Sequence, residues 1–223
     1  RTEYSDNVAR RASSAGLPSR YNSRTDWRFT PQATVSAGQP FGRQTLFLNA
    51  GIGRDYYARN TALDRARFNG SGGLQWVLGS RCAGRIQGDY STRQTSVDLF
   101  EDYLPSKQER VSATVGGTCR VASRLSANLA YDWYEVTNGL ESRRIANSKA
   151  HGLVAGLTYP IARRGSVSIS GFWRTTDFPN QLLLTGETNQ IKFSGFSVGG
   201  GYRIGPAFSV NGSIGRTKVD YRN

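Results

Sequence analysis

The side chains best suited to bind another molecule in this sequence are its arginines. Of 29 basic residues, 25 are arginines, and with 16 acidic residues the formal net charge is +13 at pH 7. A guanidinium group stays charged and can hold a carboxylate or phosphate with two parallel hydrogen bonds. A surplus of this size indicates a protein that attracts anions.

These arginines are dispersed along the chain, within stretches rich in Gln, Asn, Ser and Thr. A nucleic-acid-binding protein is one explanation, because clustered Lys and Arg supply phosphate affinity. Dispersed arginines form neither a basic tract nor a basic helix, so we expect a basic interior and no nucleic-acid partner. The candidate anion contacts are Arg28, Arg67, Arg85, Arg93, Arg110 and Arg174.

Acidic residues in the same stretches leave two interpretations open. In the alternation of these stretches, Asp89 and Asp132 fall on the same face as the arginines. Each arginine taken alone is as well explained by an ion pair with Asp or Glu that fills the interior. Taken together, the surplus of positive charge favours an interior that attracts anions.

The sequence offers little for covalent chemistry. Its one histidine, His151, follows a long polar stretch, and Glu135 and Glu141 are the candidate partners. A catalytic histidine needs an orienting carboxylate and a nucleophile or activated water, and no motif fixes these here. With two cysteines, one histidine and no Cys-x-x-Cys, we expect no metal, no cofactor and no enzyme.

Alternation with a period of two predicts the elements that position these residues. Residues 162–165 are flanked by apolar residues at every second position: Leu153, Ala155, Leu157 and Tyr159 before them, and Val167, Ile169, Gly171 and Trp173 after them. This pattern predicts an antiparallel hairpin with one apolar and one mostly polar face. Eleven strands are predicted in all, at 1–10, 25–37, 43–59, 64–79, 82–99, 109–122, 124–137, 149–162, 165–178, 190–204 and 206–221.

The connections between these strands alternate in length. Short turns lie near 38–42, 79–84, 122–124, 162–165 and 204–206, with longer polar connections between them. This alternation is typical of outer-membrane β-barrels, whereas a β-sandwich needs two inward faces filled with Val, Ile and Leu. Only 37% of the residues are hydrophobic, which favours a barrel over the alternative of a soluble basic sandwich that binds polyanions.

Strand parity carries two further predictions. Cys82 and Cys119 fall on the apolar parity at the short-turn ends of two neighbouring strands, so we expect a structural disulfide. Aromatic residues in strands need no special role, since strands favour them. Those toward the long-loop ends are nevertheless candidates for an interfacial girdle: Tyr57, Tyr103, Tyr134, Phe178 and Tyr221.

The segment Glu3-Tyr4-Ser5-Asp6-Asn7-Val8 resembles the Tyr-x-Asp-Asn-Val/Ile segment at the first strand of outer-membrane β-barrel proteins associated with exopolysaccharide export loci. The resemblance implies a barrel that passes or helps to secrete a polysaccharide. Bacterial single-chain barrels have an even number of strands and end on an aromatic residue. The last predicted strand ends at Tyr221-Arg222-Asn223, so we expect a closing strand outside this sequence, unless the first segment is not a strand.

The sequence therefore predicts one all-β domain over 1–223, an antiparallel up-and-down transmembrane β-barrel of about 11–12 strands or part of a larger one. We expect it in the outer membrane of a Gram-negative bacterium, against lipid and lipopolysaccharide, with envelope proteins as further partners. The expected function is a porin-like channel for anionic solutes, above all acidic saccharides. The alternative is a closed barrel with a structural or adhesive role, or a subunit of an envelope assembly.

Overall fold

The computed structural model describes residues 2–6, 22–95, 98–99, 102–103, 106–161, 164–182, 186–204 and 208–222. Two short 3-10 helices, η1 (Thr61–Leu63) and η2 (Glu141–Ala146), lie in connections, and strands make up most of the rest. The strands are β1 (Thr2–Ser5), β2 (Asp26–Phe29), β3 (Gln32–Phe41), β4 (Gln44–Tyr57), β5 (Arg65–Leu78), β6 (Cys82–Thr95), β7 (Asp98–Leu99), β8 (Asp102–Tyr103), β9 (Ser106–Arg120), β10 (Ser126–Asn138), β11 (Ser148–Ile161), β12 (Gly165–Leu182), β13 (Thr188–Arg203) and β14 (Ser209–Arg222). The predicted all-β class is confirmed.

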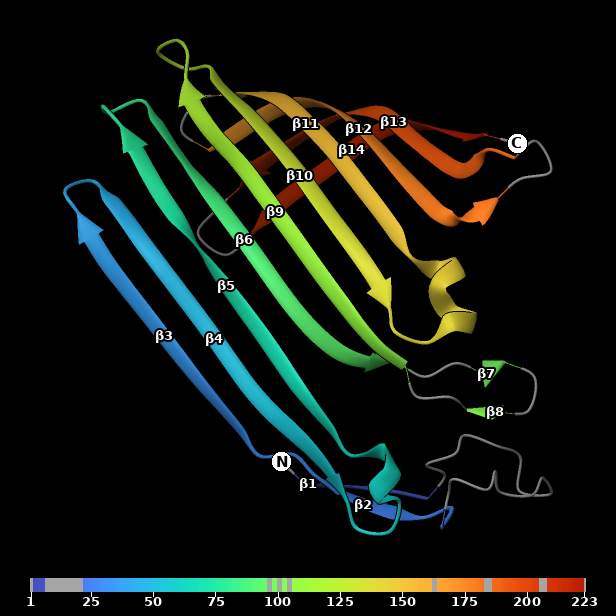
Figure 1. The fold of residues 1–223 in the computed structure, drawn as a ribbon. Coiled ribbons are helices and arrows are strands. Elements are labelled where there is room, and N and C mark those ends of the chain that lie inside the picture. Colours follow the sequence, from blue (N-terminus) through green and yellow to red (C-terminus); the bar gives the residue numbers. More distant parts are fainter. Residues whose placement is uncertain are drawn as a thin grey trace.

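Twelve strands form one antiparallel sheet in the order β1-β2-β4-β5-β6-β9-β10-β11-β12-β13-β14, with β3 also paired to β4. Each long strand lies beside the next one in the chain, which is the predicted up-and-down arrangement. β7 and β8 pair only with each other, in the connection between β6 and β9. The tight hairpin connections gather at one end of the sheet and the long connections at the other (Figure 1).

The sheet curves strongly, so that β11 to β14 curl back from the plane of β3 to β6 (Figure 1). Its two long edges are β3 and β14, and within the described residues these two strands do not pair with each other. The sheet is therefore an open, curved wall in this structure.

The predicted strand at 25–37 is two strands, β2 and β3, which lie end to end along β4. The break falls at Thr30 and Pro31. Proline has no N–H to give to a ladder, and the Pro31 carbonyl instead accepts a hydrogen bond from the Arg54 N–H at 3.1 Å. Of the strand predicted at 1–10, β1 covers residues 2–5, and residues 7–10 lie outside the described residues.

The strand registers sort the side chains onto two faces. The inner face carries the even-numbered residues of β3 and of β9 to β12, and the odd-numbered residues of β4 to β6, β13 and β14; the outer face carries the others. Outer-face side chains are the more exposed, such as Leu48 at 57% and Ile169 at 51%. Curvature crowds the concave side of a sheet, so the less exposed inner face is the concave one.

Apolar side chains form a broad band on the outer face, interrupted on β14 by Arg216, which pairs in register with Phe196. On β11 and β12 the band runs from Leu153 to Ile161 and from Val167 to Trp173, and the neighbouring strands match it in register. It spans nine residues on β11 and seven on β12, and it begins at the short turns. Beyond it, toward the long connections, the outer face turns charged at Lys107, Glu109, Glu135, Lys149 and Lys192.

The sheet has almost no conventional hydrophobic core. Among the described residues, the buried apolar side chains are Leu63 and Ala150. The strands thus place most of their large apolar side chains on the exposed outer face, where a water-soluble protein would place polar ones.

Candidate functional site

The inner face brings together the arginines singled out from the sequence. Arg67, Arg85, Arg93, Arg110 and Arg174 all have inner-face parity, and Arg28 on β2 lies opposite the inner-face residue Tyr57. Strand parity therefore places all six on one face, although they come from five different strands.

Three of the six arginines form ion pairs across neighbouring or nearby strands. Arg28 pairs with Glu3 of β1, and Arg67 pairs with Asp55 of β4. Asp55 is only 1% exposed and also accepts a hydrogen bond from the Thr30 hydroxyl at 2.8 Å. The Arg174 Nη2 lies 2.8 Å from the Asp132 Oδ2. These pairs match the interpretation in which arginines balance acidic residues in the interior.

The other three arginines have no carboxylate partner among the described residues. The guanidinium carbon of Arg85 lies 4.1 Å from the ring centre of Phe47, and that of Arg110 lies 4.5 Å from the ring centre of Tyr134. Stacking on an aromatic ring orients the flat face of a guanidinium and leaves its N–H edge free for an oxygen acceptor. Arg85 and Arg110 are therefore the inner-face groups best prepared to bind an anion.

Arg93 is held by a relay of amides toward the long-connection end. Its Nε donates to Gln108 Oε1 at 2.8 Å, and Gln108 Nε2 donates to Asn138 Oδ1 at 3.1 Å. Asn138 Nδ2 in turn donates to Asn147 Oδ1 at 3.1 Å. The relay links β6, β9 and β10 to the η2 connection and fixes the position of the Arg93 side chain.

A second polar network orders the rim beside η1. Buried Asp26 accepts hydrogen bonds from the backbone N–H groups of Trp27, Arg59 and Asn60 at 2.8, 3.0 and 2.8 Å. Asn60 is fully buried, and its Oδ1 accepts from the N–H of Asn22 at 2.8 Å. The sequence does not reveal this network, because Arg59 and Asn60 lie 33 and 34 positions from Asp26 in a polar connection with no periodic pattern.

Aromatic residues interrupt the polar inner face near Arg174. A hollow of about 420 Å³ is lined by Val154, Phe172 and Phe193 together with Asp132, Arg174 and Thr217. Flat apolar rings beside a charged pair and a hydroxyl form a surface suited to the mixed faces of a sugar ring. Phe172 was visible in the sequence as the one large residue in a row of serines.

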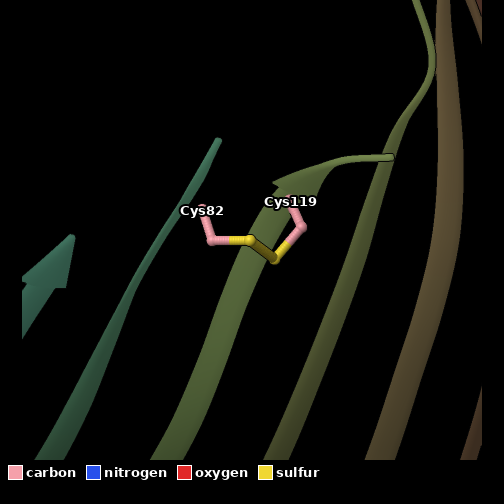
Figure 2. The surroundings of a disulfide bond; sticks show 2 residues. All are labelled: Cys82 and Cys119. Atoms are coloured by element: carbon pink, nitrogen blue, oxygen red, sulfur yellow. A yellow bond between two sulfur atoms is a disulfide. The ribbon is translucent and has the colours of Figure 1, made fainter. Parts of the chain in front are cut away.

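Cys82 and Cys119 form a disulfide between β6 and β9 (Figure 2). The two residues face each other directly in the strand register, with 4.1 Å between their Cα atoms, on the outer face at the short-turn end. The bond joins strands that are already paired, so its role is structural.

His151 lies on the outer face, with its ring centre 5.1 Å from that of Trp173. One candidate partner, Glu135, pairs instead with Lys149 at 3.1 Å, and the other, Glu141, begins η2. The described residues contain no group of three or more His, Cys, Asp or Glu side chains that could hold a metal ion.

The predicted aromatic girdle is wrong in its residues. Tyr57, Tyr134, Phe178 and Tyr221 all have inner-face parity, and the side chain of Tyr103 lies outside the described residues. Nearness to the long connections does not fix the face of a strand residue, because successive residues alternate between the two faces. The outer-face aromatic residues toward that end include Trp27, Tyr56, Phe68, Tyr90, Trp133 and Trp173.

No known protein-family pattern and no curated protein sequence matches this chain. In the part of the chain that the structure describes, no helix is long and apolar enough to cross a membrane.

Proposed function

We propose that this chain forms part or all of the wall of a transmembrane β-barrel in the outer membrane of a Gram-negative bacterium. The observation that carries the proposal is the division of the whole sheet into an exposed apolar outer face and a polar, arginine-bearing inner face. A tilted transmembrane strand needs roughly 9–11 residues, a length that β4 to β6 and β9 to β14 all exceed. Closure requires that strands beyond β3 and β14, or these edges themselves, complete the ring, because an unpaired edge is not tolerated in lipid.

The barrel passes anionic solutes, above all acidic saccharides, by diffusion. Arg85 and Arg110 lie on the inner face without a carboxylate partner among the described residues and offer weak, separate contacts to a carboxylate or phosphate. Several weak contacts raise the local anion concentration and still permit release, which a conducting path requires. No bond is made or broken in this proposal.

Planar-bilayer recording tests it. In a salt gradient the reversal potential of the full chain should report anion preference, and the double variant Arg85→Ser/Arg110→Ser should move that potential toward zero. Arg54→Ser/Arg216→Ser removes the same charge from the outer face and is the matched control, which should leave the potential unchanged. A closed or cation-selective protein would contradict the proposal.

The alternative is a filled barrel with a structural role in the envelope. The ion pairs of Arg28, Arg67 and Arg174 favour it, because paired charges and inward aromatic rings fill an interior. This alternative predicts no conductance from wild-type protein or from either double variant.

A further inference from the structure

Among the described residues, the acidic side chains of the large sheet lie in the half that meets the long connections. Each tight hairpin lies within a long stretch that contains no Asp and no Glu: 27–54, 65–88, 110–131, 142–176 and 188–219. All 16 acidic residues fall outside these stretches. Those nearest to the short turns, Asp89 and Asp132, lie at the middle of β6 and β10. The short-turn end of the sheet therefore carries positive charge alone.

At least one arginine lies at the short-turn end of each of the five hairpins. They lie in or beside the connections β3–β4, β5–β6, β9–β10, β11–β12 and β13–β14, and all are exposed: Arg43, Arg81, Arg120, Arg124, Arg164 and Arg203. We name these six residues the basic rim. Within the described residues, no carboxylate forms an ion pair with any of them. Among the six, only Arg43 donates a side-chain hydrogen bond to another described residue, to the Gly79 carbonyl at 2.8 Å.

The basic rim continues onto the inner face and not onto the outer one. Arg120 and Arg203 have inner-face parity, and Arg85 follows on the same face. At the same level the outer face is apolar, with Phe41, Leu78 and Tyr202 exposed. A lipid phosphate would meet the outer side of such a rim, whereas a solute that follows the inner face meets its charges in succession.

The inner face also offers hydroxyl and amide groups directly inside the basic rim. A hollow of about 530 Å³ is lined by Arg164 and Arg203 with Ser166, Ser209 and Asn211. Further along the same three strands, the Oγ atoms of Ser170 and Ser197 lie 2.8 Å apart. Guanidinium groups beside hydroxyls and an amide match a ligand with carboxylates and many hydroxyls, such as an acidic saccharide.

We propose that the basic rim is the capture end of the barrel, at which a linear acidic polysaccharide is taken up before it passes along the inner face. This inference rests on the proposed channel function and adds a direction to it, from the short-turn end to the long-connection end. A funnel lined by charge of one sign concentrates ions of the opposite sign and speeds their association. Because the stretches around the short turns contain no Asp or Glu, no ion pairs there cancel the positive electrostatic field of the arginines.

One-sided addition of short polygalacturonate oligomers to single channels of the full chain tests the direction. A charged thiosulfonate reagent applied from one side to Ser123→Cys, an exposed residue of the β9–β10 connection, identifies which side carries the short turns. At low salt, the rate of blocking events should be about tenfold or more higher from the short-turn side, and the difference should shrink as salt rises.

Two triple variants separate the basic rim from charge in general. Arg81→Ser/Arg124→Ser/Arg164→Ser should bring the two rates within about twofold of each other, with the reversal potential still set by Arg85 and Arg110. The control Arg65→Ser/Arg144→Ser/Lys192→Ser removes the same charge from the long-connection half and should keep the asymmetry. Equal blocking rates from both sides of an anion-selective wild-type channel would contradict the proposed capture end and leave the proposed channel function standing.

Two other outcomes have distinct meanings. If the rim variant kept its blocking asymmetry and instead lost binding to phosphatidylglycerol vesicles, the basic rim would be a lipid-headgroup surface and the proposal would be wrong. A closed or cation-selective wild-type protein would remove the proposed function, and the capture end with it.

Discussion

At the scale of single residues, the inner face holds two kinds of arginine, and their partners distinguish them. Arg174 is neutralised by Asp132 at 2.8 Å, whereas Arg85 is held against the ring of Phe47. Parity sorts both onto the inner face from the sequence alone. It does not identify their partners, because Arg174 and Asp132 are 42 positions apart and meet only through the registers of β10, β11 and β12.

This difference predicts the effect of removing one carboxylate. Asp132→Asn releases the Arg174 charge and should shift the reversal potential toward stronger anion preference, opposite in sign to the loss of Arg85 and Arg110. The control is Asp220→Asn, because Asp220 also forms an ion pair, with Lys218 at 2.9 Å, but lies on the outer face. Equal shifts from the two variants would mean that Arg174 does not line the path.

At the scale of elements, alternation and turn spacing predict the order of the strands and which face each residue occupies. They fail where the backbone departs from that pattern. Pro31 ends the first long ladder, and the partners of Asp26 come from a connection without periodicity. The predicted girdle residues are wrong for a related reason: nearness to a loop does not determine which face of the sheet a residue occupies.

Packing between β5 and β6 offers a test at this scale. A Cβ on Gly73 would lie 2.0 Å from the Ile86 carbonyl oxygen and 2.8 Å from the Phe47 ring, whereas a Cβ on the adjacent Gly72 would meet ordinary contacts at 3.4 and 3.5 Å. Gly73→Ala should therefore lower the free energy of unfolding in urea by about 1–3 kcal/mol. Gly72→Ala should change it by no more than about 0.5 kcal/mol, and a reversed order would show that the strands are not so closely paired.

At the scale of the whole molecule, the proposed channel function requires that the outer face of the sheet meets lipid. With Leu63 of η1 and Ala150 of β11 as the buried apolar side chains among the described residues, the sheet cannot hide its apolar surface within itself. The four tryptophans, Trp27, Trp76, Trp133 and Trp173, all have outer-face parity. Tryptophan fluorescence therefore reports the surroundings of the outer face directly.

Quenching of that fluorescence tests most directly whether the outer face of the sheet meets lipid. In vesicles of lipids brominated on their acyl chains, we predict strong quenching of the wild-type protein and little quenching by aqueous iodide. A control in which all four tryptophans are replaced by Phe and Thr114→Trp places one tryptophan on the inner face should show the opposite response. Wild-type fluorescence that is quenched by iodide and not by brominated lipid would place the apolar face in water and contradict the proposed membrane wall.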